Sequence, residues 1–253
     1  MHLPRKFSNG MHYQFRENFG TIGNNAKHTE KGQIALKILF IGNSYTYYND
    51  IPEIFAALAR ENGLAAEVVS VTKGGRKLYE NLDPADENGQ RIREACREGG
   101  WDVLVLQEQS VLPLKDSAAF HRGLQGLAEL VQAKRTRLYA TWGRKEGCPL
   151  LDELGMTSVQ MTKELEEAYE TAAAMLGAEL APVGSCFREL RRLQPKLELY
   201  DPDLSHPSYA GSCMSAVCHF AGIFGRLPAS CTTLALEQDQ VQAILEAAKK
   251  VLF

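Results

Sequence analysis

Two short segments at opposite ends of the chain hold the residues best suited to chemistry. Ser44 follows the apolar run 36–41 directly, in the sequence Gly42-Asn43-Ser44. Asp203 and His206 are three positions apart in a polar segment, close enough for the carboxylate to bond one imidazole nitrogen and fix its tautomer. If the fold brings the two segments together, they supply a nucleophile, a general base and an orienting acid.

Each segment also has a purely structural interpretation. A serine after a strand can simply cap the next turn, and for Ser44 alone this explanation is as good as catalysis. Asp203 and a following serine could likewise cap a helix that begins near Tyr209, with His206 paired by coincidence. The catalytic interpretation therefore depends on both segments together.

Alternating apolar segments predict the elements that must position these residues. Short apolar runs typical of buried strands are Leu36–Gly42, Ala66–Val71, Asp102–Leu106, Arg137–Trp142 and Glu179–Pro182. Helical spacing is found in Ile51–Asn62, Arg91–Glu98, Ala118–Ala133, Ser158–Leu176 and Gln240–Leu252. This alternation predicts an α/β fold whose parallel sheet is covered by helices on both faces. Ligands bind such sheets beyond the carboxyl ends of the strands, where Ser44 would lie.

Composition and length indicate one globular domain after an irregular start. The chain has 253 residues, of which 45% are hydrophobic and 23% charged, close to the average for globular proteins. Residues 1–35 show no sustained periodicity and are predicted to be an N-terminal arm or irregular cap, whereas residues 36–253 suffice for a single catalytic domain. The start has no apolar leader, and the most apolar stretch, Cys213–Gly225, is too short for a bilayer, so we expect a cytoplasmic protein without a membrane span.

Charge and motif content exclude several other classes of function. The 28 Lys and Arg against 31 Asp and Glu give a net charge of −3, which offers no electrostatic reason to expect a nucleic-acid or anionic-membrane partner. Cys213, Cys218 and His219 share one predicted helix without the spacing of a zinc site, so we expect no metal. Neither a Walker loop nor G-x-G-x-x-G is present, and we expect no cofactor.

The two segments resemble the first and last blocks of the GDSL-like, or SGNH, hydrolases. Gly42-Asn43-Ser44 is similar to their Gly-Asp-Ser block, and Asp203-Leu204-Ser205-His206-Pro207 is similar to their Asp-x-x-His-Pro block. The likeness extends from Leu36 to about Gly225. It implies a three-layer α/β/α, flavodoxin-like fold with a central parallel sheet of about five strands. It also implies a serine esterase with Ser44, His206 and Asp203 as catalytic residues.

The middle blocks, which would form the oxyanion hole, match less fully. In the family a glycine after the second strand donates its N–H, and here Gly75 fits best, with Gly74 as the alternative. Many members have Gly-x-Asn-Asp after the third strand, where this chain has Gln107-Glu108-Gln109. The amide donor is Gln107 if the segment matches the Gln-Gly-Glu of carbohydrate-ester branches, and Gln109 if it is aligned with the Asn. The N–H of Ser44 would complete the hole.

Aromatic residues near the predicted strand ends are candidates for substrate binding. Tyr45 follows the nucleophile and Trp142 closes the fourth strand, so both are predicted to line the acyl or sugar pocket, although core packing explains Trp142 equally well. Tyr47 and Tyr48 could extend this wall, with one or two of the three tyrosines packed beneath the loop. Glu108 has no partner that the sequence identifies, and we expect a charged loop residue there.

The resemblance implies a small-molecule acyl ester as substrate. We expect hydrolysis of short-chain esters, above all acetyl esters, through an acyl-enzyme, with a carbohydrate as a candidate carrier of the acyl group. The alternatives are a lysophospholipase or thioesterase that acts on longer acyl chains, and a non-catalytic scaffold that binds an acylated ligand or a protein. No self-complementary patch is evident, so the sequence predicts no particular oligomeric state. It also assigns no role to residues 1–35.

Overall fold

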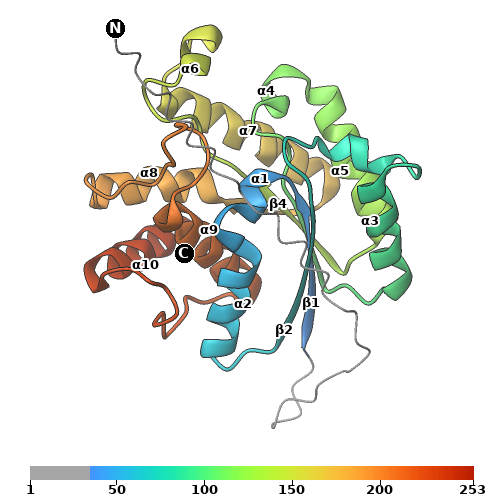
Figure 1. The fold of residues 1–253 in the computed structure, drawn as a ribbon, viewed down its shortest axis with the longest axis horizontal. Coiled ribbons are helices and arrows are strands. Elements are labelled where there is room, and N and C mark those ends of the chain that lie inside the picture. Colours follow the sequence, from blue (N-terminus) through green and yellow to red (C-terminus); the bar gives the residue numbers. More distant parts are fainter. Residues whose placement is uncertain (1–34) are drawn as a thin grey trace, which may run out of the picture. The chain divides into compact units, whose positions relative to one another are not determined.

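Five parallel strands form one sheet in the computed structural model, which describes residues 35–253 (Figure 1). The strands are β1 (Leu36–Gly42), β2 (Ala66–Thr72), β3 (Val103–Leu106), β4 (Arg135–Ala140) and β5 (Glu179–Pro182), and their order is β2-β1-β3-β4-β5. The chain passes from β1 to β2 and then crosses to β3 on the other side of β1. The strand order therefore reverses between β1 and β3, and ligands of such sheets bind in the crevice beyond this point.

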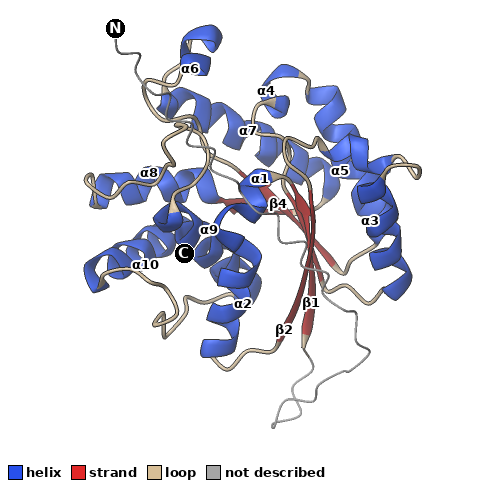
Figure 2. Ribbon diagram, viewed as in Figure 1, coloured by secondary structure: helices blue, strands red, loops and turns tan. Residues whose placement is uncertain are grey.

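Helices cover both faces of the sheet, as the alternating pattern predicted (Figure 2). One face carries α2 (Ile51–Glu61), α8 (Val183–Leu193), α9 (Tyr209–Phe224) and α10 (Gln238–Leu252), and the other carries α3 (Glu87–Glu98), α5 (Ser117–Val131) and α7 (Ser158–Leu176). Shorter helical turns occupy the connections: α1 (Ser44–Tyr47), η1 (Tyr48–Asp50), η2 (Leu78–Leu82), α4 (Leu112–Lys115) and α6 (Pro149–Leu154). The architecture is the predicted three-layer α/β/α fold.

The central strand β1 contributes to two separate cores. Ile38 and Phe40 pack against α2 and α9, whereas Leu39 and Ile41 point to the opposite face and pack against α3 and α5. All four side chains are fully buried. Because both faces of the strand are covered, its sequence is a continuous apolar run and does not alternate with polar residues. The same burial fixes the carboxyl end of β1, from which the candidate nucleophile projects.

Several elements differ from the sequence prediction, and for two of them the reason is clear. The fourth strand was predicted at 137–142 but begins and ends two residues earlier, because Arg135 is part of the strand and forms an ion pair with Glu179 of β5 at 2.6 Å. Its charge hides the start of the strand from an apolar pattern. Helix α8 was not predicted, since it follows β5 without an intervening loop.

The described residues belong to one compact unit. Nearly all of the predicted N-terminal arm, residues 1–35, lies outside the described part of the chain, and the single catalytic domain over 36–253 stays a prediction. Within residues 35–253, no helix combines the length and the apolar character that crossing a membrane requires.

Candidate active site

Ser44 stands at the carboxyl end of β1 as the first residue of α1. Asn43 caps this helix, since its Oδ1 accepts a hydrogen bond from the backbone N–H of Tyr45 at 3.1 Å. The Nδ2 of Asn43 donates to the carbonyl of Arg76 at 2.9 Å, in the loop that follows β2. One side chain thus joins the turn of Ser44 to the loop that contains Gly75. Asn is a preferred helix-capping residue, and this preference is the signal in the sequence that marks the structural role of Asn43.

The side chain of Gln107, at the end of the neighbouring strand β3, also holds the turn that contains Ser44. Its Oε1 accepts hydrogen bonds from the backbone N–H of Asn43 and from Oγ1 of Thr46, both at 2.9 Å. A Cβ atom on Gly42 would lie 2.6 Å from this oxygen, so only glycine fits at the end of β1. Gln107 is fully buried, and its Nε2 donates to the carbonyl of Glu108.

The structure brings Ser44, His206 and Asp203 together from distant parts of the sequence. The Nε2 of His206 lies 2.7 Å from Oγ of Ser44, and its Nδ1 bonds Oδ2 of Asp203. The Oδ1 of Asp203 accepts from the backbone N–H groups of Ser205 at 3.0 Å and of His206 at 2.9 Å. Partial burial raises the pKa of Asp203, but the hydrogen bonds from the His206 ring and from these two N–H groups outweigh it and hold the pKa below its usual value.

The loop that carries Asp203 and His206 is tied to the segment that follows β4. Nε1 of Trp142 donates to the carbonyl of Ser205 at 3.1 Å, and the N–H of Lys145 donates to the carbonyl of Leu204 at 2.9 Å. Leu204 has a φ of 62°, a left-handed conformation that costs energy for a residue with a side chain. The bonds on both sides of it hold the loop in this conformation.

The aromatic residues support the imidazole more than they line an open pocket. Tyr48 stacks on the ring of His206, with the centroids 4.2 Å apart and the planes 10° from parallel. Tyr45 is 3% exposed and Trp142 has no exposed surface. Trp142 lies between the rings of Tyr45 and Phe187, with its centroid 5.0 Å and 4.1 Å from theirs. The predicted pocket wall of Tyr45 and Trp142 is therefore corrected, because this stack packs both rings beneath the site. Tyr47 is 42% exposed.

The predicted oxyanion donors differ in their exposure and in the hydrogen bonds that they already make. Gly75 has a φ of 66°, which favours glycine, and is exposed in its loop. Within residues 35–253, the backbone N–H groups of Ser44 and Gly75 donate to no protein atom. The Oε1 of Gln109 accepts from the N–H groups of Val111 and Leu112 at 3.1 and 3.0 Å, which fixes the amide and leaves its Nε2 without a protein acceptor in the described chain.

Glu108 lies in the loop after β3, as the sequence predicted, but it does not lie at the surface. Its side chain is fully buried, and its Oε1 accepts from the backbone N–H groups of Leu78 at 3.0 Å and of Gln109 at 2.6 Å. Burial raises the pKa of Glu108 to about 7, although these hydrogen bonds act in the opposite direction. Because Leu78 lies in another loop, the sequence alone does not reveal it as a partner of Glu108. Glu108 connects the loop after β3 to the turn η2.

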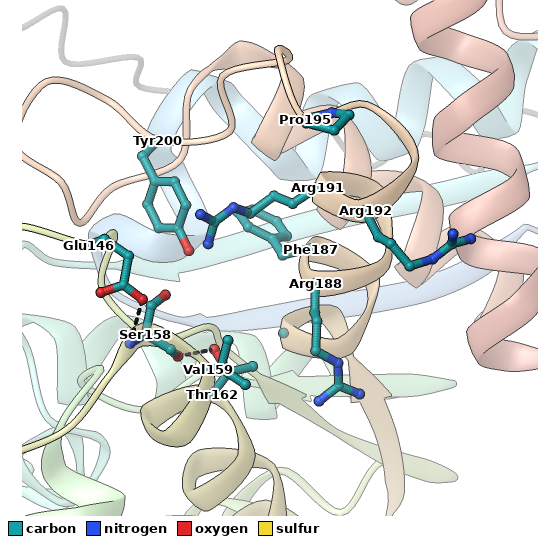
Figure 3. Close-up of a pocket in the computed structure, with 11 residues that line it drawn as sticks. Glu146, Ser158, Val159, Thr162, Phe187, Arg188, Arg191, Arg192, Pro195 and Tyr200 are labelled. Atoms are coloured by element: carbon teal, nitrogen blue, oxygen red, sulfur yellow. Dashed lines mark hydrogen bonds between the residues drawn. The ribbon is translucent and has the colours of Figure 1, made fainter.

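A cavity of about 330 Å³ is lined by residues that do not include Ser44, Asp203 or His206 (Figure 3). Tyr200 and Phe187 form part of its wall, and the hydroxyl of Tyr200 donates to the carbonyl of Gly143 at 3.0 Å. Most of the other lining residues belong to α7 and to α8, the helix that also carries Phe187. In the part of the chain that the structure describes, no group of three or more His, Cys, Asp or Glu residues could hold a metal ion.

Comparison with known proteins gives a clear result only among solved structures. No family model matches the chain, and no curated protein matches it. A protein from Slackia heliotrinireducens, described as an SGNH hydrolase, is 35% identical with a TM-score of 0.66, and the match covers 75% of this chain and 99% of that one.

Two more distant structures share the fold. A DUF4886 family protein from Bacteroides uniformis is 16% identical with a TM-score of 0.73, over 86% of this chain and 95% of that one. A carbohydrate acetylesterase from Sinorhizobium meliloti is 13% identical with a TM-score of 0.54, over 75% of this chain and 99% of that one. The identity to the Slackia protein extends over almost the whole length of that protein. The chain belongs to the SGNH hydrolase family.

Proposed function

We propose that this SGNH hydrolase is a serine esterase that uses Ser44, His206 and Asp203. The observation that carries the proposal is the unbroken chain of hydrogen bonds from Oγ of Ser44 through both imidazole nitrogens to Asp203. This connectivity activates a hydroxyl for attack on an acyl carbon, because the imidazole can accept its proton while the carboxylate stabilises the imidazolium.

The reaction proceeds in two halves. In the first half, Oγ of Ser44 bonds to the ester carbonyl carbon while its proton moves to Nε2 of His206, and the same proton then passes to the departing alcohol as the C–O ester bond breaks. In the second half, water attacks the acyl-enzyme, gives one proton to His206 and releases the carboxylic acid, and the proton returns to Ser44. Asp203 stays ionised throughout and holds the Nδ1–H of the imidazole.

The oxyanion of each tetrahedral intermediate would rest on the backbone N–H groups of Ser44 and Gly75. We assign the third donor to Gln109, because its Nε2 is uncommitted within the described residues whereas the amide of Gln107 is used in holding the nucleophile turn. Loss of one such donor typically lowers turnover about 10² to 10³-fold.

The two aromatic rings nearest in sequence to the strand ends contribute no open pocket for a long acyl chain. Tyr45 and Trp142 are packed beneath the site, with rings that are 3% and 0% exposed. An acetyl group is therefore the preferred acyl part, and an acetylated saccharide fits the resemblance in fold to a carbohydrate acetylesterase. We expect activity toward p-nitrophenyl esters to fall steeply beyond four carbons, measured as kcat/KM across a chain-length series. A rise toward eight or more carbons would instead indicate a lipase or thioesterase.

Replacement of the nucleophile tests the proposal directly. We expect Ser44→Ala to lower kcat for p-nitrophenyl acetate by about 10⁴-fold or more and to abolish labelling by a fluorophosphonate probe, while thermal unfolding shows an intact fold. The matched control Ser117→Ala, at an exposed serine that begins α5, should cleave and label like the wild type. Cleavage at the wild-type rate in Ser44→Ala would refute the proposed function.

A further inference from the structure

Arg144 is a buried cation beside the candidate active site. It follows β4 closely in the sequence and is only 9% exposed. Its Nη2 donates to Oγ of Ser110 at 2.7 Å, whereas its Nη1 is shielded from solvent and has no hydrogen-bond partner among the described residues. The next residue, Lys145, forms an ion pair with Glu198. Arg144 forms no ion pair with any residue of the described chain.

A buried guanidinium without a paired carboxylate is unfavourable. Removing a charge from water costs several kcal/mol unless an opposite charge and hydrogen bonds replace the lost hydration. Burial lowers the pKa of Arg144, while Cys148, Asp203 and Tyr200 act in the opposite direction. Asp203 does not serve as a partner, since its two oxygens already bond the ring and the backbone N–H of His206. Arginine nevertheless remains protonated in proteins, so the site keeps a positive charge.

The position of Arg144 relates this charge to the nucleophile. Its guanidinium carbon lies 5.4 Å from the centroid of the Tyr45 ring, and the imidazole centroid of His206 lies 5.3 Å from the same ring. Ser110, which holds the guanidinium, directly follows Gln109, the proposed oxyanion donor. Arg144 therefore lies where the loops after β1, β3 and β4 converge.

We propose that Arg144 and Ser110 form a subsite for a carboxylate, so that the preferred ester carries an anionic group a few bonds from the scissile carbonyl. The proposal rests on the proposed esterase function and names its substrate class. A carboxylate fits because the planar guanidinium presents parallel N–H groups to its two oxygens, and the hydroxyl hydrogen of Ser110 supplies another donor.

Matched pairs of charged and neutral substrates test the subsite. For the acyl side, the p-nitrophenyl monoester of glutaric acid is compared with p-nitrophenyl butyrate. For the alcohol side, p-acetoxybenzoate is compared with its methyl ester. After the uncatalysed rates are subtracted, the wild type should favour the charged member of one pair by about tenfold or more in kcat/KM, and the pair that responds identifies the side of the ester that carries the anion.

Variants of Arg144 show whether this preference comes from the guanidinium. Arg144→Met should reduce the charged-to-neutral ratio by about tenfold, and Arg144→Lys should retain part of it. The matched control Arg97→Met removes an exposed arginine of α3 and should leave the ratio as in the wild type. A preference for the charged member that persists in Arg144→Met would overturn the proposal.

An inhibition experiment keeps the test independent of whether the variants fold. Benzoate should inhibit p-nitrophenyl acetate cleavage by the wild type at about a tenfold lower concentration than the neutral benzamide. The subsite proposal would be overturned if the charged and neutral members of both pairs had equal kcat/KM values and benzoate and benzamide inhibited equally. The esterase function would not be affected by that result. Failure of the proposed esterase function gives a different result from failure of the subsite. In that case Ser44→Ala would cleave every substrate, charged or neutral, as the wild type does.

Discussion

The carboxylate of Asp203 acts on His206 through both the imidazole and the backbone. One of its oxygens bonds Nδ1, and the other accepts from the N–H of His206 itself, so the side chain and the main chain of the base are fixed by one group. This arrangement keeps a hydrogen on Nδ1 and leaves Nε2 free to accept the proton of Ser44. The tautomer of the base thus depends on a single residue three positions away.

Replacing Asp203 by Asn should lower kcat for p-nitrophenyl acetate by about 10³ to 10⁴-fold, because an amide can donate to Nδ1 and so place the imidazole hydrogen on the wrong nitrogen. Steady-state kinetics measure the effect. Asp201→Asn is the control, since it makes the same chemical change two residues away in the same loop. Equal losses in the two variants would show that the loop, and not the tautomer, limits the rate.

Among the elements, the loop after β3 combines structural roles with the proposed oxyanion donor. Gln107 holds the turn of Ser44, Glu108 holds η2, and Gln109 has an Nε2 without a protein acceptor in residues 35–253. The charge state of Glu108 therefore links pH to the stability of this loop. Its pKa in the folded protein is about 7, above the 4.5 of an exposed glutamate.

The raised pKa of Glu108 gives a signed prediction for stability. The folded state binds this proton more tightly than the unfolded state, so the associated stabilisation is fully present below pH 4.5 and is lost as pH rises through about 7. Glu108→Gln removes this dependence. Relative to the wild type, its free energy of unfolding should improve by on the order of 2 kcal/mol between pH 5 and pH 8, measured by denaturant unfolding. Glu98→Gln, at the exposed end of α3, is the control, and a parallel pH profile in E108Q and the wild type would contradict the prediction.

The sequence predicted the elements and the triad for reasons that the structure makes clear. Strand β1 is recognisable because burial of both faces produces an apolar run, and Ser44, Asp203 and His206 are recognisable because the two segments that hold them resemble the first and last blocks of SGNH hydrolases. The choice between Gln107 and Gln109 could not be made, since it depends on which amide is already used by a distant loop.

Buried charges were also beyond sequence reasoning. Arg144 and Glu108 are residue types that normally lie on the surface, and no local pattern marks them as buried. Trp142 shows the converse, because an aromatic residue at a strand end is equally compatible with a pocket wall and with the stack that the structure contains.

At the scale of the whole molecule, the core on the α9 side of the sheet contains a histidine. His219 is fully buried between Phe40 and Tyr139, whose ring centroids lie 5.4 and 4.6 Å from its own, and neither of its nitrogens has a hydrogen-bond partner in the described chain. Burial, aided by Arg137, lowers the pKa of His219 well below 6.5. The folded protein therefore keeps this ring neutral.

This buried histidine should make the protein sensitive to acid. Below pH 6.5 the unfolded chain binds a proton that the folded state excludes, so the free energy of unfolding falls as the pH falls. His219→Phe should be stabilised relative to the wild type by about 2 kcal/mol more at pH 5 than at pH 8, measured by denaturant unfolding. His121→Phe, at a partly exposed position of α5, tests whether removal of any histidine has the same effect. A pH-independent difference for H219F would contradict this role.

The separation of 162 positions between Ser44 and His206 has a consequence for biosynthesis. A ribosome makes Ser44 before any other part of the proposed triad, and His206 emerges only after all five strands have been translated. Under the proposed function, a chain released before that point carries a serine hydroxyl with no base to accept its proton. Hydrolytic competence would thus arise only when the segment before α9 docks onto the sheet.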